Sequence, residues 1–186
     1  MRVIDLSHHI HGEMPYFPTS EPPKIEQYAR IEENGYAEKV ISFHMHTGTH
    51  IDAPAHILDD GKCLDHFQVS NYTGKGLVID ASNIRSEIPV SFLESQSERI
   101  AQSDYILIFT GWSQKWGSQD YFKEFPVLSE EAAVWLTRFK LKGFGVDAIS
   151  VDPADSTTLP IHKILLNNQM ILIENLTNLD QILDSE

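Results

Sequence analysis

Apolar residues along the chain fall into short blocks, and most of these blocks have the length and composition of β-strands. Continuous apolar runs of this length predict inner strands, which are covered on both faces of a sheet. These runs are residues 76–81, 104–110 and 170–174, and shorter strands are expected at residues 2–6 and 143–151. Alternating polar and apolar positions at 24–30 and 37–45 instead predict strands with one exposed face.

Helical periodicity appears mainly in the second half of the chain. Residues 129–140 begin with a serine suited to cap a helix, and their apolar positions recur at helical spacing. Residues 160–166 are expected to form one or two helical turns that start with a proline, and residues 179–183 a short helix or turn. Residues 48–56 contain glycine and proline and are expected to form a loop. This order predicts an α/β protein with a mixed sheet, or two sheets, and few helices.

Length, charge and cysteine content exclude several classes of protein. The 186 residues are expected to form a single domain, residues 1–186. The formal net charge of −13 argues against binding to nucleic acid or to an anionic membrane. One cysteine, Cys63, allows neither an internal disulfide nor a thiolate zinc site. No membrane-spanning run or secretory signal is recognisable, so we expect a cytoplasmic globular protein.

Histidine is the residue type that departs from this ordinary composition. The chain contains nine histidines, and seven of them precede residue 60. Imidazole is the commonest protein ligand for transition metals and the side chain that titrates nearest neutral pH. The clustering therefore indicates a metal site or an acid–base site.

The densest part of the cluster reads HMHTGTHIDAPAH. Side chains in an extended chain repeat every two residues, so His50 and Asp52 share a face. Gly48 allows a turn that brings His46 back beside His50. Pro54 keeps the preceding residue extended and prevents the segment from forming a helix. The segment is thus able to aim two imidazoles and one carboxylate at one point.

Some of the histidines are expected to have a purely structural role. Isolated histidines are usually solvent-exposed or hydrogen-bonded in a core, and this role is the expected one for His9, His11, His44 and His66.

Known catalytic motifs fit the chain poorly. A cupin H-x-H pair is normally followed closely by a glutamate, but a histidine takes that place here. The H-E-x-x-H helix and the G-x-S-x-G elbow are both absent.

The eleven residues HTGTHIDAPAH match the H-x-G-T-H-x-D-x-P-x-H signature of the cyclase family of metal-dependent hydrolases. This family includes bacterial kynurenine formamidases and isatin hydrolases. Further matching segments extend along nearly the whole chain: DLSH at 5–8, MPYFP at 14–18, TGW at 110–112, GVDAISVD at 145–152, HKILL at 162–166 and IENL at 173–176. The resemblance implies a swivelling β/β/α-type α/β fold, with mixed sheets and few helices, that usually assembles as a homodimer or homotetramer.

The resemblance also implies a site with two metals. By analogy with the formamidases, His46, His50 and Asp52 hold one metal, and Asp52 bridges to the second. His162 holds the second metal, and Glu174 contacts both. Other branches of the family carry a single metal, so one or two ions per chain are expected, and the nitrogen and oxygen ligands predict Zn or Mn as cofactor.

The remaining roles concern proton transfer and substrate. The family pattern makes His56 the catalytic proton donor or acceptor and places Phe17 against the substrate. Tyr16, Trp112 and Trp116 are further candidates to wall the pocket, although both tryptophans are equally expected as core residues. Formamidases tend to carry alanine where this chain has Thr49, a departure that leaves the substrate open.

The chemistry of the residues supports the same function. Three imidazoles and two carboxylates suit Zn, Mn or Fe, and such ions make hydroxide available near neutral pH. The prediction is a metal-dependent hydrolase that cleaves a small amide C–N bond with metal-activated hydroxide and a histidine general acid or base. The leading substrate is an arylformamide such as N-formylkynurenine, and a cyclic amide is the other. The alternative is a non-catalytic metal- or small-ligand-binding module on the same fold.

Overall fold

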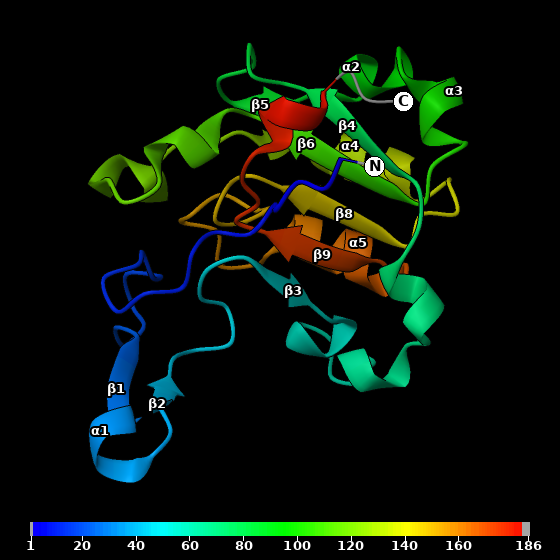
Figure 1. The fold of residues 1–186 in the computed structure, drawn as a ribbon. Helices are drawn as coiled ribbons and strands as arrows, with labels where there is room; N and C mark the ends of the chain where they lie inside the picture. The colour runs from blue at the N-terminus through cyan, green and yellow to red at the C-terminus, as the bar shows by residue number, and fades with distance from the viewer. Residues whose placement is uncertain (1, 184–186) are drawn as a thin grey trace.

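A five-stranded mixed sheet forms the centre of the protein, for which the computed structural model describes residues 2–183 (Figure 1). The strand order is β3–β9–β8–β6–β4. The strands are β3 (His50–Asp52), β4 (Gly76–Asp80), β6 (Tyr105–Phe109), β8 (Gly143–Val146) and β9 (Ile171–Glu174). The last four run parallel to one another, and only β3 is antiparallel to its neighbour, β9. The expected mixed sheet with few helices is therefore confirmed.

Apolar residues on both faces explain why the parallel strands lie inside. All five residues of β6 are buried, as expected for a central strand with neighbours on either side. Helices α4 (Glu130–Leu136) and α5 (Pro160–Asn167) pack together behind the sheet (Figure 1). Ser129 caps α4, because its side chain accepts a hydrogen bond from the backbone N–H of Ala132. The main apolar core lies between these helices and the sheet, and a smaller cluster covers the opposite face.

Short elements surround this sheet. A second, two-stranded sheet pairs β5 (Glu87–Ile88) with β7 (Val127–Leu128) in parallel. Helices α2 (Val90–Glu94) and α3 (Ser97–Ile100) precede β6. Six 3-10 helices complete the described chain: Pro54–His56, Leu64–His66, Val69–Tyr72, Trp112–Lys115, Gln119–Phe122 and Leu179–Ile182. Among the residues that the structure describes, no helix is long and apolar enough to cross a membrane.

A separate hairpin projects from the body of the protein. Strands β1 (Lys24–Ala29) and β2 (Glu38–Ser42) pair antiparallel, and the short helix α1 (Ile31–Asn34) lies in their connection. Figure 1 shows this hairpin, here called the arm, extending away from the central sheet. Every residue of β2 is exposed. Ala29 is the one residue of β1 that is buried.

Four expectations about elements differ from the structure. Residues 2–6 form no strand; only the adjacent Ser7 bridges to Leu176, just after β9. The strand expected at 143–151 ends at Val146, because the next residue, Asp147, turns inward to accept hydrogen bonds from Thr110. The helix expected at 129–140 ends at Leu136. The loop expected at 48–56 contains strand β3, which is stabilised by a partner strand far away in the sequence.

Candidate metal centre

Strand pairing brings the two distant halves of the predicted ligand set together. In the β3–β9 register, His50 lies directly opposite Glu174. The Nε2 atom of His50 is 3.5 Å from Oε2 of Glu174. Gly48 adopts the left-handed conformation, with φ of 71°, and turns the chain so that His46 approaches the same point. The sequence-based expectation of a turn at Gly48 is confirmed.

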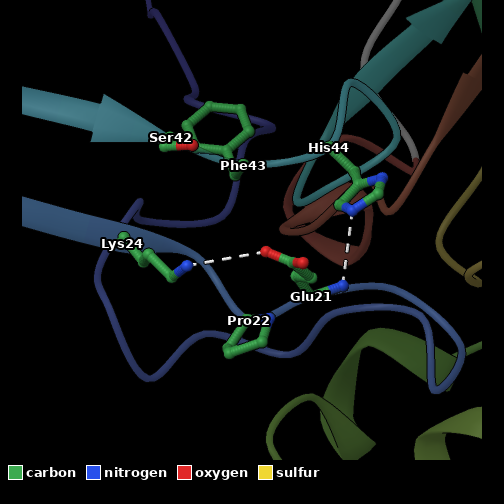
Figure 2. Close-up of a pocket in the computed structure, with 6 residues that line it drawn as sticks. All are labelled: Glu21, Pro22, Lys24, Ser42, Phe43 and His44. Atoms are coloured by element: carbon green, nitrogen blue, oxygen red, sulfur yellow. Dashed lines mark hydrogen bonds and ion pairs between the residues drawn. The ribbon is translucent and has the colours of Figure 1, made fainter.

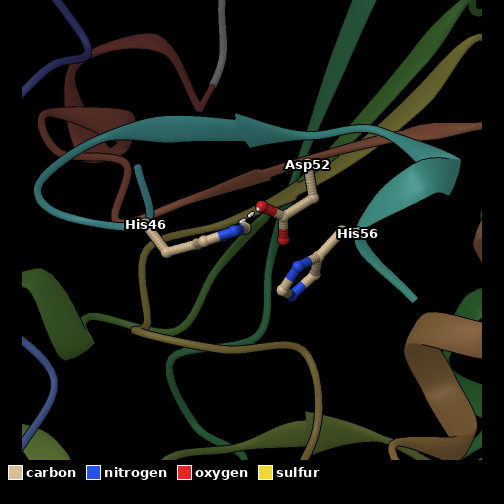
Figure 3. Close-up of side chains that lie close together, drawn as sticks. All are labelled: His46, Asp52 and His56. Carbon is tan, nitrogen blue, oxygen red and sulfur yellow. Dashed lines mark ion pairs between the residues drawn. The ribbon is translucent and has the colours of Figure 1, made fainter. Parts of the chain in front are cut away.

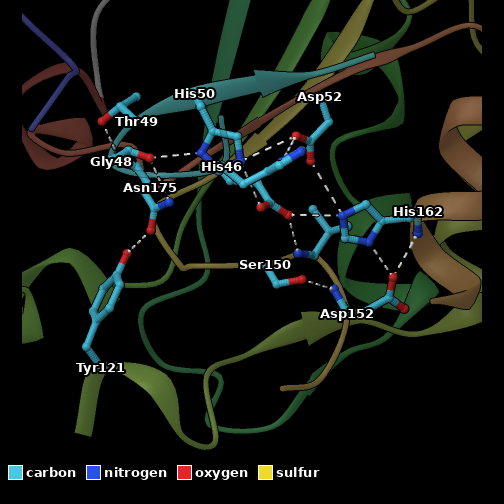
Figure 4. A network of polar contacts seen from close by, with 12 residues as sticks. His46, Gly48, Thr49, His50, Asp52, Tyr121, Ser150, Asp152, His162 and Asn175 are labelled. Carbon is cyan, nitrogen blue, oxygen red and sulfur yellow. Dashed lines mark hydrogen bonds and ion pairs between the residues drawn. The ribbon is translucent and has the colours of Figure 1, made fainter. Parts of the chain in front are cut away.

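Asp52 is the centre of the cluster (Figure 4). Its Oδ1 atom lies 2.7 Å from Nδ1 of His46 and 3.3 Å from Nε2 of His50. Its Oδ2 atom lies 3.6 Å from Nε2 of His162. The side chain of Asp52 is fully buried, so its carboxylate is desolvated and faces three imidazoles instead of water.

Helix α5 supplies His162 in a fixed orientation. The Nδ1 atom of His162 is 2.6 Å from Oδ2 of Asp152, and its Nε2 atom is 3.3 Å from Oε1 of Glu174. Asp152 also accepts hydrogen bonds from the backbone N–H groups of Ile161 and His162, in the first turn of α5. One carboxylate therefore caps the helix and orients the imidazole that the helix carries.

His56 lies beside the same carboxylate but comes from the 3-10 helix after β3 (Figure 3). Its ring centroid is 3.9 Å from that of His46 and 5.8 Å from that of His162. His56 keeps an exposed surface, but the protein around its ring displaces enough water to lower its pKa to about 4. An imidazole with such a pKa is neutral near pH 7, so it accepts a proton before it can donate one.

Two overlapping groups of side chains have the spacing of metal ligands. His46, Asp52 and His56 form one group, and His50, Asp52 and Glu174 form the other. Asp52 belongs to both groups, as expected of a carboxylate that bridges two ions. His162 is in neither group but contacts Asp52 and Glu174, so all five predicted metal ligands lie together, and His56 lies within ligand distance of them.

Several buried polar atoms of this cluster lack a hydrogen bond that would compensate their burial. Within residues 2–183, Nε2 of His50 and both carboxylate oxygens of Asp52 are buried without a hydrogen bond of acceptable geometry. Such atoms are costly to bury unless a ligand satisfies them. Nitrogen and carboxylate oxygen are also the donors that zinc and manganese accept. The residues present thus fit a divalent metal ion.

The charges of the cluster are strongly coupled when no cation is bound. Burial acts to raise the pKa of Asp52, but the imidazoles of His162, His46 and His50 hold it far below its usual value. Burial likewise acts to lower the pKa of His162, but its contacts with Asp152, Asp52 and Glu174 raise it to about 11. The carboxylates therefore attract positive charge into this buried site, whether protons or a metal ion.

A large cavity opens in front of the cluster. Its volume is about 890 Å³, within the range of small-molecule sites. His46, His50, Asp52 and His56 contribute to its wall. The remaining lining is mostly apolar: Phe43, Met45, Ile51, Ala53, Ala55, Cys63, Leu64 and Asp65. The cavity therefore offers a polar, ligand-rich point beside apolar side chains that are themselves partly exposed to solvent.

The predicted pocket aromatics lie elsewhere. Phe17 is 37% exposed and is not among the residues that line the cavity, so its contact with substrate stays a prediction. Trp112 is buried in the main core, where its indole N–H donates to the backbone oxygen of Tyr121. Trp116 stacks on His8 rather than facing the metal centre. Tyr16 lines a separate, smaller cavity.

His44 has the structural role expected for it. It lies at the base of the arm, where its Nε2 atom accepts a hydrogen bond from the backbone N–H of Glu21 (Figure 2). Glu21 also forms an ion pair with Lys24, with 3.5 Å between Oε2 and Nζ. This small polar pocket connects the arm to the chain that precedes it and contributes nothing to the metal centre.

Several residues that support the centre are not predicted by the sequence. Asp152 follows a strand in a segment that resembles the family, but only the structure places it against His162. Tyr121 carries no signal of its own, and Asn175 lies in the matched IENL segment without a role assigned to it, although their side chains are buried and hydrogen-bonded to each other. Nothing in the local sequence separates such residues from ordinary core residues. For Asn175 the available signals are its position directly after the predicted ligand Glu174 and the match of the IENL segment to the family.

Comparison with known proteins agrees with this geometry. A family model described as "Putative cyclase" matches residues 4–153. The chain is 30% identical over 176 residues to a kynurenine formamidase of Erythrobacter litoralis, a match that covers 94% of this chain and 79% of that protein. A kynurenine formamidase of Bacillus cytotoxicus is 30% identical over 184 residues, covering 98% and 85%. The structure of isatin hydrolase A from Ralstonia solanacearum has a TM-score of 0.85 and 29% identity, covering 97% of this chain and 81% of that one.

Proposed function

Because the chain belongs to the cyclase family and is a metal-dependent amide hydrolase, we propose that it cleaves the C–N bond of a small aryl amide. The leading substrate class is an arylformamide such as N-formylkynurenine, and a cyclic amide such as isatin is the second. The observation that carries this proposal is a cluster of ligand side chains and His56 at one wall of a mostly apolar cavity.

The cavity supports an aromatic substrate. Phe43, Met45, Ile51 and Leu64 present apolar surface beside the metal centre, and a flat ring buries its faces well against such side chains. An amide group on that ring would then lie next to the polar, ligand-rich part of the wall. This arrangement favours an aryl amide over a highly charged substrate. We also propose that Phe17 contributes to the same pocket once substrate is bound, as the family resemblance implies.

The proposed ligands are His46, His50, Asp52, His162 and Glu174, with Asp52 shared between two Zn or Mn ions. Support comes from the group of His50, Asp52 and Glu174, from the contacts of His46 and His162 with Asp52, and from the uncompensated buried atoms of Asp52 and His50. A bound divalent ion would supply hydroxide near neutral pH and polarise the scissile carbonyl. Asp152 holds the imidazole of His162 from its Nδ1 side, which leaves Nε2 directed toward Asp52 and Glu174.

His56 is proposed as the residue that moves the proton. In its neutral form the imidazole accepts a proton from the attacking water as the water oxygen adds to the carbonyl carbon. It then donates this proton to the amide nitrogen as the C–N bond breaks, so that acid and amine leave as separate products. General acid–base help of this kind contributes about 10²–10⁴-fold in rate.

The experiment that tests this function combines metal content with leaving-group dependence. Wild-type protein should hydrolyse arylformamides, lose activity with a chelator and recover it with Zn²⁺ or Mn²⁺. His56→Ala should keep its metal and lose about 10²–10⁴-fold in kcat, with the loss shrinking as the leaving amine becomes more acidic. His66→Ala, an exposed histidine outside the cavity, serves as the control. Metal loss in His56→Ala would make His56 a ligand instead, and metal binding without hydrolysis of any small amide would indicate the binding module.

We further propose that the protein is a cytoplasmic homodimer or homotetramer, formed through the arm. Two-stranded hairpins are at best marginally stable on their own in water. Tyr28, Ile31, Val40 and Ile41 on the arm are each at least half exposed in the single chain. Contact with a second copy would cover this surface, as apolar patches of this kind usually require.

A further inference from the structure

The carbonyl of Gly48 lies between the metal centre and the core. It is 2.9 Å from Nδ1 of His50 and accepts a second hydrogen bond, also of 2.9 Å, from the side-chain amide of Asn175 (Figure 4). A carbonyl oxygen has two lone pairs, so these two donors use its full capacity. The position of the carbonyl thus depends on Asn175 as well as on the imidazole.

The Gly48 carbonyl fixes the direction of the hydrogen bonds that connect His50, Gly48, Asn175 and Tyr121. The Gly48 oxygen can only accept, so Nδ1 of His50 carries a proton, and in the neutral imidazole that binds a metal Nε2 is the nitrogen with the lone pair. For the same reason the nitrogen of the Asn175 amide faces Gly48, and its Oδ1 atom faces away. Oδ1 accepts from the hydroxyl of Tyr121 at 2.7 Å. Nε2 of His50, which carries the lone pair in this neutral tautomer, is the nitrogen that faces Asp52 and Glu174.

Asn175 is itself held firmly in position. It is 1% exposed, and its backbone N–H donates to the carbonyl of Ala148. Its φ of 57° lies in the left-handed region, which asparagine tolerates better than most residues. Tyr121, which is fully buried, fixes the amide from the other side. The amide therefore has one arrangement available to it.

We propose that Asn175, supported by Tyr121, is a positioning residue that sets the metal-binding tautomer and orientation of His50 through the Gly48 carbonyl. This inference rests on the proposed role of His50 as a metal ligand. Outer partners of metal-binding histidines typically fix the ring and its tautomer in this way. Here the partner is a backbone carbonyl, and its own position depends on a side chain more than a hundred residues further along the chain.

The test measures metal affinity rather than turnover. Zn²⁺ is competed against a chromophoric chelator, and the visible absorption of the Co²⁺-substituted protein reports the geometry of the ligands. Asn175→Gly tolerates the positive φ and removes the amide, and it should weaken Zn²⁺ binding about tenfold. Tyr121→Phe removes a single hydroxyl and should weaken binding about threefold. Both variants should change the Co²⁺ spectrum.

Thr49→Val is the matched control. The Thr49 hydroxyl donates to the backbone oxygen of Asn175 and accepts from the backbone N–H of His8, so it connects the same segments without touching the Gly48 carbonyl. The variant should have a lower free energy of unfolding, while its Zn²⁺ affinity should change less than about twofold. Equal losses of affinity in Thr49→Val and Asn175→Gly would reduce Asn175 to a structural anchor and overturn the proposal. Should Asn175→Gly fail to fold, Tyr121→Phe decides by the same comparison.

A further variant separates this proposal from the function on which it rests. His50→Ala should lose far more Zn²⁺ affinity than any variant above. Wild-type affinity in His50→Ala would overturn the metal centre and the positioning role with it. Loss of affinity in His50→Ala, together with wild-type affinity and spectrum in Asn175→Gly, would overturn the positioning role alone.

Discussion

At the scale of single residues, Asp52 decides how much positive charge the centre can hold. Its buried carboxylate faces imidazole nitrogens of His46, His50 and His162 at 2.7 to 3.6 Å. Without that charge, two cations would repel each other in a site with little water to screen them. The other carboxylate of the set, Glu174, also accepts a hydrogen bond from the backbone N–H of Val151, so part of its capacity is already used.

Asp52→Asn should therefore lose one or both metal ions while keeping its fold. We expect metal affinity to fall by more than the about 10–100-fold that loss of a ligand's hydrogen-bond partner costs. Metal stoichiometry by elemental analysis and the circular dichroism spectrum together check this outcome. Asp59→Asn, which changes an exposed carboxylate nearby, should keep the full metal content. Full stoichiometry in Asp52→Asn would show that Asp52 does not bridge two ions.

The environment of His8 makes the stability of the protein depend on pH. Its ring stacks on Trp116 with 3.8 Å between centroids, and burial lowers its pKa to about 4. The unfolded chain binds a proton at His8 below pH about 6.5, whereas the native protein does so only below about 4. Folding stability therefore falls as the pH drops from about 6.5 to 4, and this pH dependence is absent above that range.

Replacing His8 with phenylalanine should remove this part of the pH dependence while retaining the stack. Urea unfolding of wild type and His8→Phe from about pH 4 to 8 would measure it, with wild type losing more stability toward low pH. His66→Phe, in which an exposed histidine changes, should follow wild type. Parallel pH profiles for His8→Phe and wild type would show that His8 titrates normally in the folded protein.

At the scale of elements, helix α5 and its metal ligand depend on one carboxylate. The N-cap residue of α5 provides no side-chain cap, and Asp152 from the preceding loop bonds two N–H groups of the first turn instead. The same carboxylate accepts from Nδ1 of His162. A change at Asp152 should thus affect both the helix and the metal.

Asp152→Asn places an amide group where His162 and the helix N–H groups all need an acceptor. We expect about 10–100-fold weaker metal binding and a lower free energy of unfolding for the metal-free protein. Chelator competition and urea unfolding would measure the two effects. Asp155→Asn, an exposed neighbour in the same loop, should change neither quantity. Unaltered metal affinity in Asp152→Asn would mean that His162 keeps its orientation without this partner.

The strands also differ in how well the sequence predicts them. The strands near 76–81, 104–110 and 170–174 were predictable because buried parallel strands have continuous apolar runs. Strand β3 was not, since it is three residues long and its partner lies far along the chain. His46, His50 and Asp52 were predictable because such residue types are rare in that density, whereas His162 and Glu174 were predicted only from the resemblance to the family. Asp152 and Asn175 lie in segments that match the family, but their contacts, like those of Tyr121, run across the fold and are seen only in the structure.

At the scale of the whole molecule, the arm is the part whose apolar side chains are not packed into a core in the single chain. Strand β2 is exposed at every residue, and Val40 and Ile41 are 50% and 51% exposed. Hydrophobic contacts between copies of the chain would bury this surface. The oligomer proposed above therefore depends on the arm and not on the central sheet.

Val40→Lys with Ile41→Lys should shift the protein from oligomer to monomer. Sedimentation velocity over a range of concentrations would measure the change. Val69→Lys offers a control, since Val69 is 81% exposed but lies outside the arm. A wild-type protein that sediments as a monomer, or a double variant that remains oligomeric, would contradict the role of the arm.

Strand β3 is the edge strand of the central sheet, and this position affects how the protein aggregates. It covers the apolar strand β9 with only three residues, two of which, His50 and Asp52, are proposed metal ligands. Short edge strands open easily, and an uncovered apolar edge offers its backbone to strands of other molecules. A bound ion would join β3 to β9 and α5 and so keep that edge closed. Protein stripped of its metal should then aggregate through intermolecular strand pairing at β9 well before its sheet unfolds.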